Sequence, residues 1–465
     1  MANATTYLQN PTTGSSVAAE RKTWTFACWF KRADIKNSSG DSYFTVGSSS
    51  SSQTYFSAIY GWNRITFYEY ATPSVISTVS TSSFHADPTA WTHLCVAYDS
   101  TQATASDRVK IYINGSEASY NGTPTYPPQN NASYFGITNG GDGYSTWLGG
   151  FANSYYFDGC MADVYWIGGT AYPGSTFVTT DSVTGEVKPN TAPSITYGSG
   201  VATNAHLTFE DASNLGKNTA PGFTSNHWSV VAGNLKQLQD NPSNNFAKFD
   251  DVADSTQMQL YQYGTTFMSG NANPIMMPST LGFTTGKWYM EMKMGGGSGG
   301  GGHWLCGISG RLTRYQSSTH LGRDTDDYGY HGVNGDILNN SSSNSGDSYA
   351  DTYTSGDYIG IAVDATNNKI YFSKNGTWQN SGDPAAGTNG HTIKSVSETN
   401  TGFWRFACGD YDTTPDYYFY ANFGDGVFGT ETAGTNADGA GYGKFKYTVP
   451  TGFYSLCTKN LSTYG

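Results

Sequence analysis

The stretch 356–378, GDYIGIAVDATNNKIYFSKNGTW, contains two runs in which apolar and polar residues alternate. Successive side chains of a β-strand point to opposite faces of its sheet, so each run predicts a strand with one buried side. The polar segment 364–368 separates the two runs, and the second run is followed by Asn375-Gly376, the dipeptide best suited to a type I′ turn. We therefore expect a meander of short antiparallel strands.

The same alternation recurs in the first half of the chain. It is clearest in four segments, 23–31, 90–98, 109–115 and 157–167. Charged residues make up only 13% of the chain, whereas aromatic residues reach 15% and glycines number 57. This composition favours short strands and polar turns over long helices. For a chain of 465 residues, the sequence predicts an all-β protein of two antiparallel, jelly-roll-like β-sandwich domains in tandem, with almost no helix.

Three motifs in the second half resemble the SPRY (B30.2-type) family. They are TTGKWYMEMKM at 284–294, KIYFSKNGTW at 369–378 and YYFYANFGDGVF at 417–428. The resemblance implies a bent antiparallel β-sandwich over residues 251–465 that binds partners through its loops and is not catalytic.

The strands of the first half resemble a laminin-G-like, concanavalin A-like lectin domain. The segments that carry this resemblance are WTFACWFKR, WTHLCVAYD, VKIYINGS and FDGCMADVYW. We expect this domain to cover residues 1–210. Residues 211–250, rich in Asn, Pro and Gly, are then expected to form an irregular, partly packed connector.

The connector and the C-terminal end carry a further resemblance. Within 214–250 the chain reads FTSNHWSVV and DNPSNNFAKF, and it ends with KFKYTVPTGFYSLCTKNL at 444–461. Together with the order of the two domains, these segments resemble a family of virion proteins of tailed bacteriophages. The resemblance implies a structural protein of the virion, exposed on the particle and present in many copies or as a homo-oligomer.

Charge, the N-terminal segment and the cysteines limit the partners, the cellular location and the covalent cross-links that this chain can have. The net charge is −12 and the 24 Lys and Arg residues form no run, which argues against nucleic acid and anionic membrane surfaces as partners. The N-terminal segment has no secretory pattern and no apolar run is long enough to span a membrane, so we expect synthesis in the host cytoplasm without membrane insertion. The six cysteines form no C-x-x-C pair, which favours buried free thiols over a disulfide framework.

Catalytic and metal-binding patterns are incomplete. Glycoside hydrolysis needs two carboxylates beside the scissile bond, but Glu210 and Asp211 are adjacent, so on a strand they would face opposite ways, and Glu291 stands alone among methionines. We therefore predict no catalytic residues and no cofactor, with Ca²⁺ left as an open possibility. The candidate Ca²⁺ loops are Asp324-Thr-Asp326-Asp327, Asp410-Tyr-Asp412 and Gly141-Asp142, although position 335 is Gly where an EF-hand loop needs Glu.

Two stretches combine aromatic residues with hydrogen-bonding groups, as ligand recognition by loops requires. The first, 59–70, contains Tyr60 and Trp62. The second, 313–332, is expected to be a long exposed loop, since it lacks an apolar strand pattern. Its candidate contact residues are Arg314, Tyr315, Arg323, Tyr328, Tyr330 and His331.

These observations lead to three hypotheses for function. The first is a non-enzymatic virion surface protein, such as a tail-fibre-like, capsid-fibre or capsid decoration component, that attaches to a host glycan or protein receptor, with carbohydrate binding by the lectin-like half. The second is a purely structural virion subunit that contacts other virion proteins. The third is a glycan depolymerase. Binding to host envelopes separates the first two, and release of reducing sugar identifies the third.

Overall fold

A computed structural model of the chain provides the structure. It describes residues 7–10, 17–32, 43–48, 55–61, 64–83, 85, 87–135, 145–150, 156–157, 159–182, 185–201, 204–233, 235–250, 258–261, 264–269, 276–296, 302–311, 319–411 and 417–465.

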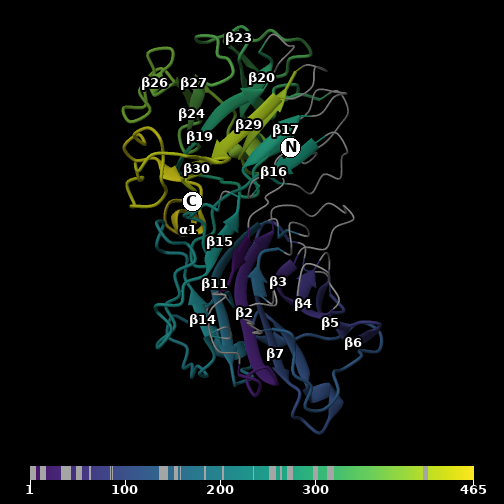
Figure 1. The fold of residues 1–465 in the computed structure, drawn as a ribbon. Coiled ribbons are helices and arrows are strands. Elements are labelled where there is room, and N and C mark those ends of the chain that lie inside the picture. The colour runs from purple at the N-terminus through teal and green to yellow at the C-terminus, as the bar shows by residue number, and fades with distance from the viewer. Residues whose placement is uncertain are drawn as a thin grey trace. The chain divides into compact units, whose positions relative to one another are not determined.

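The chain folds into two units, Met1–Gln237 and Leu238–Gly465 (Figure 1). The boundary falls inside the stretch 211–250 that we expected to act as a connector. Residues 229–232 of that stretch form an edge strand of the first unit, and Ala247 and Phe249 belong to the core of the second. The stretch is thus divided between the two units.

The first unit contains two large sheets and a small ribbon in its described part. One sheet has the order β15 (Ser229–Ala232), β1 (Tyr7–Gln9), β10 (Ser145–Leu148), β3 (Tyr43–Ser48), β4 (Tyr55–Gly61), β5 (Ile65–Ala71) and β6 (Ser74–Ser80). The other has the order β14 (Asn204–Leu207), β11 (Gly159–Gly168), β2 (Thr23–Arg32), β7 (Thr92–Asp99), β8 (Val109–Ile113) and β9 (Ser116–Glu117). The ribbon pairs β12 (Val178–Thr180) with β13 (Val187–Pro189), and two short 3₁₀ turns cover Ala105–Asp107 and Gly174–Thr176.

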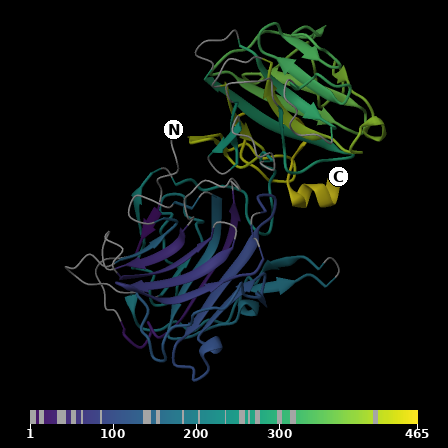
Figure 2. The same ribbon diagram turned by 90° about the vertical axis from the view of Figure 1, so that its right-hand side faces the viewer.

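Side chains from both large sheets form the core of the first unit. Trp24 and Phe26 on β2 and Trp166 on β11 are buried with Phe67 on β5 in one cluster. The rings of Trp24 and Tyr98 lie parallel, with centroids 4.9 Å apart. The predicted alternation is therefore confirmed: the central strands of both sheets contribute one face to a shared core, which defines a sandwich. Figure 2 shows the ribbon of this unit from a second direction.

The second unit is also built from two large sheets. The first has the order β16 (Met258–Tyr261), β17 (Thr266–Ser269), β29 (Tyr417–Asn422), β19 (Lys287–Gly296), β24 (Tyr358–Asp364), β25 (Lys369–Lys374) and β26 (Thr377–Trp378), with β27 (His391–Thr392) on β25 and β32 (Tyr454–Ser455) on β19. The second has the order β18 (Met276–Pro278), β28 (Arg405–Asp410), β20 (Trp304–Ser309), β21 (Asp327–His331), β22 (Asp336–Leu338) and β23 (Asp347–Ser348). A ribbon pairs β30 (Val427–Phe428) with β31 (Glu431–Thr432), a 3₁₀ turn covers Val396–Glu398, and the helix α1 covers Thr458–Tyr464.

The C-terminal segment covers the outer face of the larger sheet in this unit. Phe445 and Phe453 pack there against Tyr289 of β19. The buried Glu291 carboxylate accepts hydrogen bonds from the backbone N–H groups of Lys446 and Tyr447, both at 2.8 Å. Burial raises the pKa of Glu291, although these hydrogen bonds oppose the rise. The glutamate that stands alone among methionines in the sequence therefore anchors the C-terminal segment.

The hairpin at 375–376 has the predicted geometry. Asn375 and Gly376 have φ values of 50° and 84°, both positive as a type I′ turn requires. In addition, a Cβ atom built on Gly376 would lie only 2.5 Å from Cδ1 of Tyr447.

We predict that Gly376→Val lowers the free energy of unfolding of the second unit by about 1–3 kcal/mol, because a β-branched residue is strained at positive φ and its side chain would also meet the ring of Tyr447. Gly387→Val is the matched control, since Gly387 also has positive φ (73°) but a Cβ atom added there would meet nothing within 4 Å. Denaturant titration should rank the variants wild type, Gly387→Val, Gly376→Val in falling stability. Equal stability of the two variants would show that the contact with Tyr447 is readily relieved.

All six cysteines are free and buried, as the sequence predicted. In the described part of the chain, no helix has the length and apolar character needed to cross a membrane.

Candidate functional site

A polar groove of about 920 Å³ opens on the second unit. It is lined by Tyr328, Ile337, Asn339, Asn340, Ser341, Ser342, Ser343, Ser345, Gly346, Asp347, Asn380, Gly390, His391 and Thr392. Most of these side chains carry hydroxyl or amide groups, which donate and accept hydrogen bonds without carrying charge. The groove thus suits a ligand rich in polar, uncharged groups.

One wall of the groove is the segment 339–347, which we call the serine wall. Its hydroxyl groups bond to its own backbone: Ser341 Oγ donates to the carbonyl of Ser345 at 2.7 Å. The serine wall is also attached to strand β22, because the carboxylate of Asp336 accepts a hydrogen bond from the backbone N–H of Gly346 at 3.1 Å. Serine and asparagine form such local turns readily, so this polar loop has a defined shape.

Tyr328 and His391 form the aromatic part of the groove. Tyr328 lies on β21, and its hydroxyl accepts the backbone N–H of Lys394 at 3.0 Å. The ring of His391 on β27 meets that of Tyr328 edge to face, with centroids 5.8 Å apart. Burial lowers the pKa of His391, so its imidazole is neutral at pH 7. The groove therefore offers a neutral imidazole beside its hydroxyl and amide groups.

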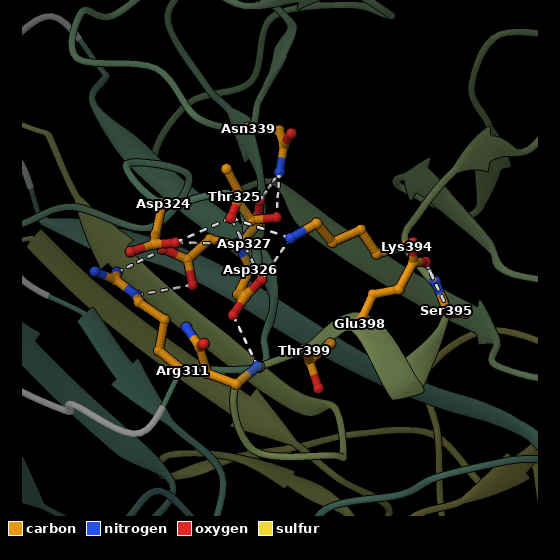
Figure 3. Close-up of polar contacts among 12 residues, drawn as sticks. Arg311, Asp324, Thr325, Asp326, Asp327, Asn339, Lys394, Ser395, Glu398 and Thr399 are labelled. Atoms are coloured by element: carbon orange, nitrogen blue, oxygen red, sulfur yellow. Dashed lines mark hydrogen bonds and ion pairs between the residues drawn. The ribbon is translucent and has the colours of Figure 1, made fainter.

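A network of charged and polar residues supports this side of the groove (Figure 3). Nε of Arg311 donates a hydrogen bond to Oδ1 of Asp327 at 3.0 Å, and Nη2 of Arg311 lies 2.6 Å from Oδ2 of Asp327 in an ion pair. The carboxylate of Asp326 accepts two hydrogen bonds, one from the ammonium group of Lys394 at 2.7 Å and one from the backbone N–H of Asn400 at 2.9 Å. Burial raises the pKa of Asp327 to about 6, against the opposing effect of the Arg311 guanidinium. Buried pairs of this geometry hold a loop in one conformation.

Three of the aspartates considered as Ca²⁺ ligands, Asp324, Asp326 and Asp327, have protein partners in this arrangement. Asp326 and Asp327 take part in the network above, and Asp324 Oδ1 accepts the backbone N–H of Asp326 at 3.3 Å. Among the residues that the structure describes, no group of three or more His, Cys, Asp or Glu side chains is arranged to hold a metal ion. Asp142 and Asp412 lie outside the described residues.

The expectation that 313–332 is one exposed loop is wrong for its last part. Tyr328, Tyr330 and His331 belong to strand β21 and are 6%, 0% and 0% exposed. Tyr330 points into the core, where its ring lies 5.0 Å from that of Phe372. Tyrosine favours strands, and two tyrosines at alternate positions are the period-2 signal that we read as a loop surface. Replacing them would disrupt packing, so they cannot serve as exposed contact residues, apart from the edge of Tyr328 in the groove.

The other candidate residues fall into three groups. Arg323 is exposed on the second unit and does not line the groove. Tyr60 is half-buried on the outer face of its sheet, where it packs with Trp147 and meets Tyr68 at 6.3 Å between ring centroids. Trp62, Arg314 and Tyr315 lie outside the described residues. A binding role for these residues stays a prediction.

Sequence reasoning missed the serine wall, Asn380 and His391. The run SSSNS at 341–345 carried the available signal, since such runs mark polar loops. Asn380 and His391 carried no signal, because only the fold brings these segments to the same groove.

The first unit contains a polar cluster that bears on the depolymerase hypothesis. His206 Nε2 lies 3.2 Å from Asp163 Oδ1, and its Nδ1 lies 3.1 Å from Thr219 Oγ1. Asp163 has a φ of 47° and sits where the register of β11 against β2 shifts. However, Thr219 Oγ1 also lies 3.0 Å from the His206 carbonyl, to which it can donate, and the cluster has one carboxylate where glycoside hydrolysis uses two. The cluster is better suited to joining β14 to the segment after it.

Comparison with known families agrees with this architecture. The model described as "Concanavalin A-like lectin/glucanases superfamily" matches residues 3–170, and the model described as "SPRY domain" matches residues 287–401. Both domains are therefore present in this chain. The groove lies in the SPRY half, and the cluster around His206 is only partly matched by the concanavalin A-like model, which includes Asp163 but neither His206 nor Thr219.

Individual proteins match only parts of the chain. A "Ran-binding proteins 9/10 homolog" of Drosophila melanogaster is 34% identical over 91 residues, which are 20% of this chain and 9% of the relative. The SPRY domain of human HERC1 is 16% identical and covers 37% of this chain and 96% of its own length, with a TM-score of 0.28. Stonustoxin is 14% identical and covers 38% of this chain and 27% of its own, with a TM-score of 0.27. The chain thus spans less than a tenth of the Drosophila protein.

The two domain types are binding modules, and SPRY domains mediate protein interactions. Their presence indicates a binding or adhesion role for this chain.

Proposed function

We propose that the chain is a non-enzymatic protein exposed on the surface of a bacteriophage virion, where it attaches to a receptor on the host envelope. The motifs of the connector stretch and the C-terminal segment support the virion origin, because they resemble tailed-phage virion proteins. The two binding modules support attachment. The partners are then other virion proteins on one side and a host glycan or protein on the other.

The observation that carries this proposal is the polar groove of the SPRY domain. Its serine wall, Asn380 and His391 present hydroxyl, amide and imidazole groups on a rigid sandwich. Such groups can bond to the hydroxyl groups of a glycan or to the polar side chains of a receptor loop. Many copies on one particle would convert weak binding by each groove into strong attachment.

The test blocks the groove without removing its internal bonds. Ser342 is exposed and lines the groove, so Ser342→Trp should fill it. Ser397 is exposed on the 3₁₀ turn outside the groove, and Ser397→Trp is the matched control. Beads coated with each protein are mixed with envelopes isolated from a bacterium that supports the virus. We expect Ser342→Trp to lower the apparent affinity about tenfold or more, equivalent to about 1.4 kcal/mol, and Ser397→Trp to bind like the wild type.

The other hypotheses predict different results. A purely structural subunit would bind no envelope in any form but would still enter particles. A depolymerase would release reducing sugar from the envelopes. Envelope binding that is equal in both tryptophan variants would place the contact outside the groove, and Tyr60 and Trp62 of the concanavalin A-like domain would be the next candidates.

A further inference from the structure

Lys248 and two aspartates form a buried cluster near the beginning of the second unit. The side chain of Lys248 is 3% exposed, and the side chains of Asp240 and Asp425 are 0% exposed. Nζ of Lys248 lies 2.9 Å from Oδ1 of Asp425 and 3.4 Å from Oδ2 of Asp240. One amine and two carboxyl groups therefore meet in a part of the core that is closed to bulk water.

Hydrogen bonds hold both aspartates in place. Oδ1 of Asp240 accepts the backbone N–H of Phe246 at 3.1 Å, while its Oδ2 faces Lys248. The backbone of Asp425 is held as well, because its carbonyl accepts the N–H of Gln239 at 3.1 Å. Groups that are held at contact distance react as if each were present at a very high concentration. The cluster therefore has the arrangement that a reaction between its own members requires.

Burial makes the ionic form of this cluster costly. One ammonium and two carboxylates place three charges in the core, and each of them has lost its hydration. When a proton passes from Lys248 to Asp425, the cluster becomes an amine, a carboxylic acid and one carboxylate, so that a single charge remains. A neutral amine is a nucleophile, whereas an ammonium is not. The neutral form thus places a nucleophile 2.9 Å from a carboxyl oxygen.

We propose that Lys248 and Asp425 condense to a side-chain amide, with Asp240 as the general base and acid. Nζ of Lys248 attacks Cγ of Asp425, which forms the C–N bond. The carboxylate of Asp240 takes one proton from the nitrogen and returns it to the departing hydroxyl group, so that the C–O bond breaks and one water molecule leaves. Amine and carboxylic acid thus give amide and water, and no oxidant or other reactant is consumed.

The amide would close the second unit covalently. Lys248 follows the boundary between the units and Asp425 lies in the turn after β29, so the bond joins two segments that are distant in the chain. The dry core protects the product, because water is the reagent that would hydrolyse it. A cross-link of this kind restricts the unfolded chain, as a disulfide does. This inference goes beyond receptor binding and does not depend on it.

Mass spectrometry of the denatured full chain tests the amide. Wild-type protein that has been kept folded at neutral pH should be lighter than the unlinked chain by the mass of one water molecule. Trypsin should not cleave after Lys248 once its amine is an amide, so the digest should contain a branched peptide that joins 237–287 to 406–444. A wild-type chain without this peptide, or a bond from Lys248 to Asp240 instead, would overturn the proposal.

Two asparagine variants separate the roles of the aspartates. Asp425→Asn keeps a carboxamide that the amine can attack, so it should lose the mass of one ammonia molecule instead of one water molecule. Asp240→Asn keeps both reacting groups but lacks the proton acceptor, so it should keep the mass of the unlinked chain; water loss at the wild-type level would contradict the role of Asp240. Exchange of the β24 amides shows whether each variant is folded, and the wild-type digest decides the existence of the amide without either variant.

Lys287 and Asp364 of the same unit are the internal control. Nζ of Lys287 lies 3.1 Å from Oδ2 of Asp364, but the Lys287 side chain is 31% exposed, so its ammonium stays hydrated. Trypsin should therefore cleave after Lys287 in the same digest. An amide at this pair as well would show unspecific dehydration of the sample and would overturn the assignment. Stability does not separate ion pair from amide, because Lys248→Met removes both, whereas the mass does.

Discussion

Replacing Lys248 with Met should lower the free energy of unfolding of the second unit by about 3–5 kcal/mol. Lys248 is only 3% exposed, and its ammonium group lies 2.9 Å from Asp425 Oδ1 and 3.4 Å from Asp240 Oδ2. Both aspartates are buried. Methionine fills the volume of the lysine stem but leaves the two carboxylates in the core without their ammonium partner, and water cannot solvate them there.

The ion pairs of Lys248 join segments that are far apart in the chain. Asp240 and Lys248 lie in the stretch after the unit boundary, and Asp425 lies in the NFGDG turn after β29. The Asp425 carbonyl also accepts the backbone N–H of Gln239 at 3.1 Å. The ion pairs therefore attach the first residues of the second unit to its interior.

Exchange of the β24 amides in the full chain reports the unfolding of this unit alone. Lys374→Met is the matched control: its ammonium lies 3.5 Å from Asp357 in a partly exposed ion pair of the same unit, and such pairs contribute about 0–1 kcal/mol. A loss for Lys248→Met no larger than that of Lys374→Met would mean that the two aspartates bind protons or water instead.

Replacing Asp438 with Ala should cost the same unit about 3–5 kcal/mol, because several buried donors lose their acceptor together. One carboxylate oxygen accepts the backbone N–H groups of Ala440 and Tyr442, at 2.9 and 3.0 Å. The other accepts the N–H and hydroxyl of Ser455 and the amide of Asn460, at 2.8, 2.7 and 2.8 Å. Asn460 lies on helix α1 and is fully buried, so this carboxylate joins the last helix to the sandwich.

Asp383→Ala provides the comparison for this variant. Asp383 is exposed and its side chain accepts the backbone N–H of Ala386 at 3.0 Å, so water can replace the carboxylate. Denaturant titration should show a large loss for Asp438→Ala and a change within about 0.5 kcal/mol for Asp383→Ala. In Asp438→Ala, exchange of the α1 amides should rise more than that of β24, and uniform loss across the unit would argue against a local anchor.

The strands of both sandwiches could be predicted from the sequence because their signal is local. Ile359, Ile361 and Val363 alternate with residues of the opposite face, and the structure buries all three in one core. Asn375-Gly376 specifies its turn through backbone sterics that involve two residues only. The same local reasoning failed at Tyr328 and Tyr330, where the alternating residues are tyrosines between polar neighbours.

The sequence could predict that the candidate site is polar, but not where in the fold it lies. A run of serines and asparagines signals a polar loop, but nothing local to 341–345 shows that it faces His391, nearly fifty positions further along the chain. That proximity follows from the pairing of β27 with β25, together with the packing of Tyr328 against His391 across the two sheets. A groove is a property of segments that are distant in sequence, so its position depends on the whole fold.

The sequence alone determined the all-β class, the two sandwich domains, the turn at Asn375-Gly376 and the burial of the cysteines. These follow from side-chain alternation and backbone sterics, which act over a few neighbouring residues. Only the tertiary structure decided the roles of Lys248, Glu291 and Asp438. Each is a polar residue whose function depends on partners brought close by folding, because those partners determine the free-energy cost of burying a charged group and the pKa of that group.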